Sequence, residues 1–342
     1  MAYSTISKPS LHFNIKLYTG TGSSNAITGV GFQPDFVWLK DRGNSTAQCL
    51  FDAPRGAGKR IQTNSTDAEY TNVQQLSSFD SDGFTVGTNG DANGNGADFV
   101  SLNWKANGQG SSNSDGTINT TYTSVNTTAG FSISTYTGNG VNGATVGHGL
   151  GAVPKLVWIK RLSNADAMIQ YHHRLGNAAS FKLDRTDGSN TGNFWNSTTP
   201  TSSVVTMTNS TECNVNGQTY VMYCFAEIKG FSKVEEFKGN STNNFIYTGF
   251  APALIIAKTN ATDWWSWQDN KRLRTSHLSK LLFPNTGDAE TNGVNTRCLS
   301  NGFLANTTNT GFNNSSYTTY FIAFAAETLV ANVGESIPVT AK

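Results

Sequence analysis

Short apolar segments alternate with stretches rich in Gly, Asn, Ser and Thr along most of the chain. The apolar segments have the length of strands, and none repeats with the 3.6-residue period of an amphipathic helix. Three of them lie between a proline and a lysine, at residues 34–40, 154–160 and 252–258. Because these three contain almost no polar position, each is expected to form a strand that is buried on both faces. The pattern therefore predicts an all-β protein.

These three strands belong to a longer set of features that recurs in the same order. Each copy opens with an aromatic strand that ends in a turn, at residues 18–20, 136–138 and 237–239. The proline-to-lysine strand follows, and a closing strand completes the copy, at residues 99–106, 220–227 and 320–327. An ordered set of this kind indicates tandem repeats. Short strands separated by Gly and Asn are typical of sandwiches and jelly rolls, so we predict three tandem antiparallel β-sandwich or jelly-roll-like repeats.

The repeats are expected to span residues 11–108, 130–229 and 230–330. Residues 1–10 and 331–342 lie outside them, as an N-terminal docking segment and a C-terminal tail, and such ends often dock on neighbours. Gly and Ser around residues 108–112 predict a flexible linker between the first two repeats. Within the first and third repeats, Ser81-Asp82-Gly83 and Ser300-Asn301-Gly302 predict hairpins with primed turns.

Charge and composition exclude several classes of partner. Only 14% of the residues are charged and the formal net charge is +1, so neither nucleic acid nor an anionic membrane surface is expected as a partner. No apolar run approaches the roughly 20 residues that a membrane-spanning helix needs. The N-terminus lacks the basic and apolar regions of a secretory signal, so we expect the chain to be made in a cytosol.

No residue pattern indicates an enzyme, a metal or a cofactor. The four cysteines, at positions 49, 213, 224 and 298, lack the paired spacing of a metal site and are expected to be free and mostly buried. His172 and His173 are adjacent in an expected strand and point to opposite faces, so they cannot form a two-histidine metal site alone. A nucleophile elbow is absent. Paired carboxylates for glycoside hydrolysis need only meet in space, which keeps that alternative open.

One aromatic cluster offers a candidate binding site. Trp264, Trp265 and Trp267 are followed closely by Asp269. Flat aromatic rings beside acids and amides suit the apolar face and the hydroxyls of a sugar, so these four residues are candidate glycan ligands. The alternative is that the rings fill the core of the repeat or an interface, where tryptophan is also enriched.

A basic residue recurs at a matching place in the three repeats, as Arg55, Arg174 and Arg272. It lies two or three residues after a polar residue that occupies the same place in each repeat but differs in type: Asp52, His172 and Asp269. Recurrence of the basic residue predicts a structural hydrogen bond or ion pair within each repeat.

Several of these strings resemble a known family. They are Tyr18-Thr19-Gly20-Thr21-Gly22-Ser23, residues 31–40 and 81–87, Tyr136-Thr137-Gly138-Asn139-Gly140, Gly147-His148-Gly149-Leu150-Gly151 and residues 247–252. The chain is similar, over most of residues 11–330, to the repeated β-domain of structural proteins from tailed phages, notably marine and cyanobacterial ones, which are often described as tail-fibre-like. The resemblance implies a non-enzymatic virion component that is made in the host cytoplasm and assembles as a homo-oligomer.

The sequence therefore favours a phage tail fibre, spike or other particle-surface appendage, for which we expect a trimer with other virion proteins as partners. Residues 1–10, 331–342 or the first repeat would dock on the particle. Three alternatives stay open: a capsid decoration or cement protein, an attachment protein that binds a host surface glycan, and, more remotely, a polysaccharide depolymerase.

Overall fold

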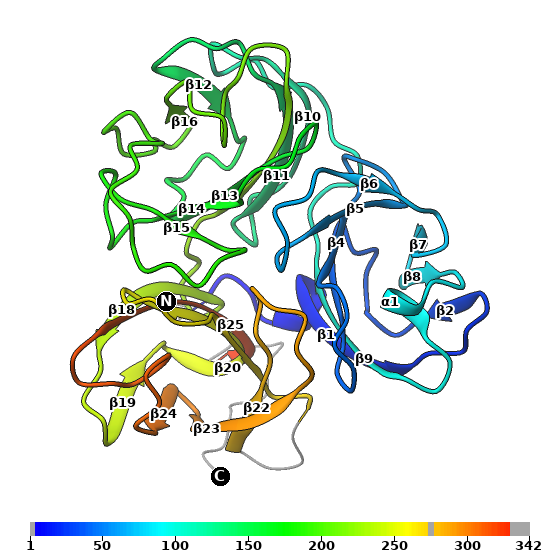
Figure 1. Ribbon diagram of the computed structural model, residues 1–342, viewed down its shortest axis with the longest axis vertical. Helices are drawn as coiled ribbons and strands as arrows, with labels where there is room; N and C mark the ends of the chain where they lie inside the picture. Colours follow the sequence, from blue (N-terminus) through cyan, green and yellow to red (C-terminus); the bar gives the residue numbers. More distant parts are fainter. Residues whose placement is uncertain (1–3, 273–276, 329–342) are drawn as a thin grey trace.

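The computed structural model of the chain describes residues 4–272 and 277–328 and consists of antiparallel sheets arranged in three lobes around a common centre (Figure 1). Helical structure in the described residues is limited to the 3-10 turn η1 (Pro9–Leu11) and the single turn α1 (Gly90–Asn93). The prediction of an all-β fold is confirmed.

The first lobe contains a six-stranded and a three-stranded sheet. The six-stranded sheet has the order β1-β9-β3-β4-β5-β6 and the smaller one the order β2-β8-β7. The strands are β1 (Phe13–Thr19), β2 (Asn25–Ile27), β3 (Phe36–Asp41), β4 (Cys49–Asp52), β5 (Lys59–Gln62), β6 (Tyr70–Thr71), β7 (Leu76–Asp80), β8 (Gly83–Val86) and β9 (Asp98–Trp104).

The second lobe contains a six-stranded sheet of order β10-β11-β17-β13-β14-β15 and the pair β12-β16. The strands are β10 (Thr120–Asn126), β11 (Phe131–Thr137), β12 (Ala144–Gly147), β13 (Leu156–Arg161), β14 (Ile169–His172), β15 (Phe181–Lys182), β16 (Val204–Met207) and β17 (Thr219–Phe225).

The third lobe contains two four-stranded sheets, of order β18-β25-β20-β21 and β19-β24-β23-β22. The strands are β18 (Ser232–Lys238), β19 (Asn243–Tyr247), β20 (Phe250–Thr259), β21 (Ser266–Asp269), β22 (His277–Leu281), β23 (Thr291–Leu299), β24 (Gly302–Asn306) and β25 (Thr318–Thr328).

One sheet of each lobe has a corresponding strand order, β1-β9-β3-β4, β11-β17-β13-β14 and β18-β25-β20-β21. The proline-to-lysine segments supply β3, β13 and β20, which lie inside these sheets. Every residue of β3 and β13 is buried, as is β20 from Pro252 onward. Burial of these strands on both faces is therefore confirmed. Pro252 lies where the register of β20 shifts, a position at which a missing N–H is tolerated.

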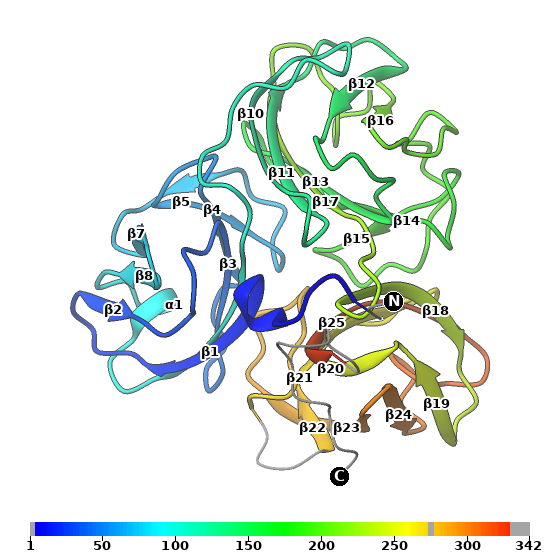
Figure 2. The same ribbon diagram turned by 180° about the vertical axis from the view of Figure 1, so that it is seen from behind.

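The three lobes share one core instead of each having only its own. The sheets that hold β3, β13 and β20 face the common centre (Figures 1 and 2). There the ring of Trp38 lies 6.2 Å from that of Trp158 and 5.5 Å from that of Trp267, so Trp38 of the first lobe packs against one tryptophan of each other lobe. Ile6 also reaches this core. The lobes therefore cannot be separated without exposing large aromatic side chains, which would cost several kcal/mol for each ring.

Loops that pass from each lobe to the next reinforce this core. The third lobe docks on the first, because Gln48 Nε2 donates to Phe283 O (2.9 Å) and Thr63 Oγ1 to Pro284 O (2.6 Å). The first docks on the second in the same way, since Asp166 N donates to Thr66 O at 2.8 Å.

The second lobe docks on the third and closes the cycle. Asp263 N donates to Thr186 O at 2.9 Å, and Ser189 N donates to Asn260 O at 3.3 Å. In all three contacts a loop of one lobe lies against the region around the end of β3, β13 or β20 of the next lobe. The lobes therefore form a head-to-tail ring that is closed within one chain.

A buried asparagine explains the glycine that follows each opening strand. Asn93 donates to the carbonyls of Ser23 and Gly87 and accepts from the amide of Thr21. This clamp brings the chain so close that a Cβ on Gly20 would lie 2.2 Å from Gly94 O. Asn214 and Asn313 make the matching contacts in the other lobes.

Two expectations about connections need correction. The stretch after residue 108 is not a free linker: Gly108 N bonds to Asp35 Oδ1 (3.1 Å), and residues 120–126 form β10, which pairs with β11 and so lies before the expected start of the second repeat. The hairpins at residues 80–83 and 299–302 form, but neither Asp82 nor Asn301 has the positive φ of a type I′ turn. Residues 1–3 and 331–342, from the expected docking segments, lie outside the described residues.

Candidate functional site

The structure places the tryptophan cluster mainly in the interior. Trp267 is fully buried against Trp38 at the common centre. Trp265 is 2% exposed, and its indole N–H donates to Lys182 O of the second lobe at 3.1 Å. Both rings therefore fill contacts between lobes. A sugar cannot stack on either of them, which corrects the glycan interpretation of these two residues.

Asp269 is also unavailable to a ligand. Its carboxylate is 1% exposed and accepts from Trp267 Nε1 (3.0 Å), Arg272 N (3.1 Å) and Arg272 Nε (2.5 Å). Trp264 alone of the four candidates reaches the surface, at 38% exposure, with its ring against Phe283. One isolated ring without the expected acid beside it is not the predicted glycan site.

Asp269 and Arg272 instead belong to a buried ion cluster that the first lobe also contains. Arg272 Nη1 bonds to Glu290 (3.0 Å) and Nη2 to Trp267 O (3.1 Å). In the first lobe, Arg55 bonds through the same atoms to Asp52, Glu69 and Leu50 O. The predicted ion pair within the repeat is confirmed in these two lobes.

The second lobe differs because its polar residue is His172. Arg174 there pairs with Glu235 of the third lobe, so this arginine connects two lobes. His172 is buried, with Nδ1 accepting from Arg174 N (3.3 Å) and Nε2 donating to Phe321 O (3.4 Å). Burial lowers the pKa of His172 to about 3, and the neighbouring His173 adds to this shift. Both histidines therefore serve the joint between lobes.

Lys40, Lys160 and Lys258, each the second-last residue of β3, β13 or β20, hold the docking loops. Lys40 Nζ donates to Asn44 O (2.9 Å) and to Gly287 O of the third lobe (3.0 Å), while Lys160 Nζ donates to Thr66 O of the first lobe (2.9 Å). Burial lowers the pKa of Lys40 and of Lys258 to about 8. These buried cations satisfy loop carbonyls, a structural use of charge.

The possible metal ligands and the thiols of the described residues are not arranged as a metal site or as reactive groups. No group of three His, Cys, Asp or Glu side chains among them could hold a metal ion. The four cysteines are unpaired, and burial raises the pKa of every thiol, to about 12 for Cys49, Cys213 and Cys298. A thiol with so high a pKa is a poor nucleophile.

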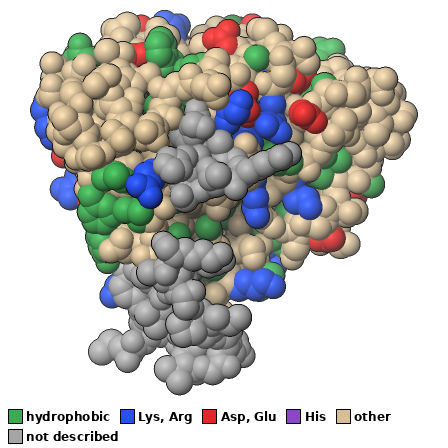
Figure 3. Space-filling model, turned by 90° about the horizontal axis from the view of Figure 1, so that it is seen from below, with side chains coloured by type: hydrophobic (Ala, Val, Ile, Leu, Met, Phe, Trp, Pro, Cys, Tyr) green, Lys and Arg blue, Asp and Glu red, His purple; other side chains and the backbone are tan. Residues whose placement is uncertain are grey.

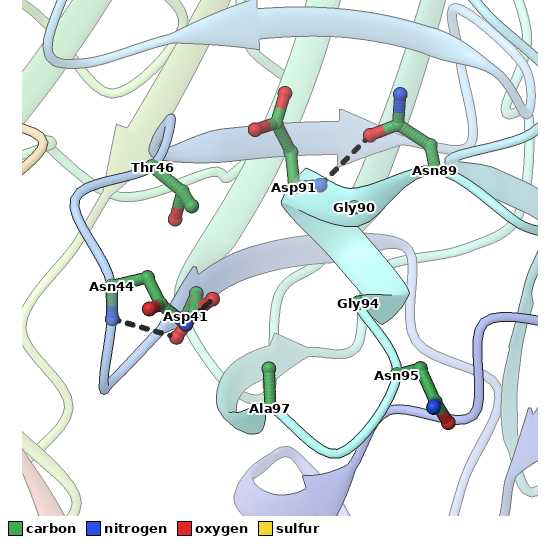
Figure 4. Close-up of a pocket in the computed structure, with 9 residues that line it drawn as sticks. All are labelled: Asp41, Asn44, Thr46, Asn89, Gly90, Asp91, Gly94, Asn95 and Ala97. Carbon is green, nitrogen blue, oxygen red and sulfur yellow. Dashed lines mark hydrogen bonds between the residues drawn. The ribbon is translucent and has the colours of Figure 1, made fainter.

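One polar hollow opens on the first lobe, between the end of β3 and the turn α1 (Figure 4). Its volume is about 400 Å³, and uncharged polar groups and two carboxylates line it. The lining residues are Asp41, Asn44, Thr46, Asn89, Gly90, Asp91, Gly94, Asn95 and Ala97. No motif in the sequence predicts this hollow, although Asp41 differs from its counterparts Arg161 and Thr259, each the residue that follows the lysine of the buried strand.

The walls of the hollow are held in place from behind. The Asp41 carboxylate accepts from Gly43 N (2.9 Å) and Asn44 N (3.1 Å), and Lys40 holds the same turn. Arg60 pairs with Asp91 at 2.8 Å. Gln75, which is fully buried, donates to Asn89 Oδ1 at 3.2 Å. The polar groups are therefore pre-positioned, as they are in ligand sites.

Fold and site together define an all-β protein of three interlocked lobes whose buried charges serve its own structure. No helix in the described part of the chain is long and apolar enough to cross a membrane. The chain belongs to the family described as a domain of unknown function, DUF7483, whose model matches residues 8–328. No curated protein and no solved structure matches it.

Proposed function

We propose that this chain is a non-enzymatic structural component of a phage particle, in a tail fibre, a spike or another surface appendage that assembles as a homo-oligomer. The observation that carries the proposal is the head-to-tail closure of three lobes on one aromatic core, in which Trp38 contacts both Trp158 and Trp267. Such closure makes a rigid block suited to bearing load. The resemblance to tailed-phage structural proteins is the reason for proposing that this block is part of a phage particle.

The distribution of charge agrees with a structural role. The buried acids and bases described above bond to one another or to loop carbonyls. On the face shown in Figure 3, charged side chains of both signs are scattered among uncharged ones. A surface of this kind keeps a protein soluble in a crowded assembly and gives no single-sign field for a polyanion.

The test uses particles of a phage whose genome encodes this chain. Mass spectrometry of gradient-purified particles should detect the chain, and a cryo-EM reconstruction should locate its three lobes. Density on a fibre or spike is the expected result, whereas density on the capsid would favour the decoration protein. Absence of the chain from intact particles would refute the proposal.

A second candidate function is attachment to a host glycan, because a polar hollow of about 400 Å³ opens at the surface of the first lobe. Adsorption of particles to host cells should then be inhibited by the purified chain. An unchanged rate of adsorption in the presence of excess chain would argue against this role.

A further inference from the structure

We infer that the hollow lined by Asp41, Asn95 and Ala97 binds one unit of a neutral or amino sugar within a surface glycan. The inference rests on the attachment function proposed above and names the site and the class of ligand. The tryptophan cluster takes no part in it.

The second lobe has side chains where the first lobe has the hollow. Ala97 O and Gln218 O accept equivalent bonds from Gly20 N and Gly138 N, both 2.8 Å long, so Gln218 corresponds to Ala97. Arg161 corresponds to Asp41, because each is the last residue of its strand.

In the second lobe these two long side chains meet. Arg161 Nη2 donates to Gln218 Oε1 at 3.0 Å, and Arg161 Nη1 lies 3.6 Å from Asp166 Oδ2. The third lobe has Tyr317 at the position of Ala97, since Tyr317 O accepts from Gly239 N. The first lobe thus has two short side chains, Asp41 and Ala97, where the second has a hydrogen-bonded plug. The hollow of about 400 Å³ lies in the first lobe at the place that this pair of side chains occupies in the second lobe.

The polar groups that line the hollow can form hydrogen bonds with a sugar. Around the opening lie the amides of Asn44, Asn89 and Asn95 and the hydroxyl of Thr46. The Asn95 side chain is exposed and lines the hollow, so its amide is accessible to a ligand. Amides and hydroxyls that offer both donors and acceptors match the hydroxyls of a sugar.

The charges narrow the class of sugar. Asp41 and Asp91 give the hollow two carboxylates, whereas the nearest cations, Lys40 and Arg60, are engaged behind the lining by loop carbonyls and by Asp91. A carboxylate or phosphate on the ligand would meet like charge, and an ammonium group would meet opposite charge. Because Arg60 offsets the charge of Asp91, the Asp41 carboxylate carries this preference, and neutral and amino sugars should bind more tightly than uronic acids or phosphorylated sugars.

The test is binding of the purified full-length chain to an array of neutral, amino and uronic-acid oligosaccharides, followed by calorimetric titration with the strongest neutral or amino probe. Asn95→Ala should weaken binding at least tenfold because it removes this amide. Asn216→Ala is the matched control: a Cβ placed on Gly140 would lie 3.1 Å from Asn216 Cβ, as one placed on Gly22 would from Asn95 Cβ, so the two asparagines have equivalent positions, but only Asn95 lines the hollow. The control should bind as the parent chain does.

A second variant keeps the test independent of Asn95. Ala97→Gln introduces the side chain of the second lobe into the hollow and should also lower affinity at least tenfold, with the thermal midpoint of unfolding unchanged. The inference is overturned if no neutral or amino oligosaccharide binds at millimolar concentration, if uronic-acid probes bind best, or if Ala97→Gln binds like the parent. A chain that is found in particles but binds no sugar overturns this site alone, and a chain that binds sugar but is absent from particles overturns the structural function alone.

Discussion

Acid should loosen the joint between the second and third lobes through His172. The imidazole is 1% exposed, and its ring lies 5.5 Å from that of His173 and 5.2 Å from that of Tyr320. Burial is the main cause of its low pKa, and the charges of His173 and Arg174 lower the pKa further, while Glu235 opposes them. Folding therefore favours the neutral ring, which donates to Phe321 O of β25 in the third lobe.

The size of the effect follows from the two pKa values. The unfolded chain has an ordinary histidine pKa of 6.5 and the folded chain a value of about 3. Because the folded pKa is lowered, the unfolded state binds the extra proton first, and stability falls as the pH drops through this interval. At 1.36 kcal/mol for each pH unit, the loss is about 2 kcal/mol at pH 5 and about 3 kcal/mol at pH 4.

The assay is urea unfolding of the parent chain and of His172→Asn at pH 7, 6, 5 and 4. Asparagine keeps an acceptor for Arg174 N but does not titrate. The variant is expected to be less stable at pH 7, and the difference between the two chains should shrink by about 3 kcal/mol towards pH 4. Carboxylates titrate in both chains and cancel in the comparison. Two curves that stay parallel from pH 7 to pH 4 would refute the reasoning.

Three further predictions test the interior. Arg272→Met leaves a buried carboxylate unpaired and should lower the free energy of unfolding by about 3–5 kcal/mol in urea titrations, whereas Arg174→Met, at a half-exposed pair, should cost about 1 kcal/mol or less; equal losses would contradict this. Gly20→Ala forces its Cβ against a backbone carbonyl and should lower the thermal midpoint by several degrees, while Gly90→Ala, with open space, should not. Lys40 has a folded pKa of about 8, below the usual 10.5, so its contribution to stability rises with pH between these values; Lys40→Met should remove about 3 kcal/mol of that rise, and unchanged pH dependence would argue against it.

The all-β fold class could be predicted from the sequence, because the length of a strand and the presence of an apolar run depend on residues that are close in sequence. The run at residues 36–40 reads as a strand buried on both faces, and β3 is one. The arrangement of the lobes could not be read in the same way. The contact between Trp38 and Trp267 joins residues far apart in the chain, and no local signal predicts which surfaces of three similar segments will meet.

The candidate site also could not be predicted from local sequence alone. Trp265 and Trp267 have the composition of a sugar platform, but composition does not reveal burial, and both rings lie between lobes. The hollow, by contrast, left a signal in the sequence. Asp41 stands where the second repeat has Arg161, and a short side chain in place of a long one indicates missing volume. Comparison of the repeats position by position finds that site, whereas a search for motifs does not.

The closed ring of lobes also restricts how copies of this chain can assemble. Each lobe binds a loop of the previous lobe: Lys40 Nζ donates to Gly287 O, and Lys160 Nζ donates to Thr66 O. A trimer built from the same head-to-tail contact would have to open the ring and expose the aromatic core. The homo-oligomer that we propose must therefore use the outer surfaces of the lobes. Light scattering with cross-linking of the purified chain tests this: cross-links between copies should fall outside residues 63–69, 182–190 and 283–290, and links between copies at these loops would show that the lobes exchange between chains.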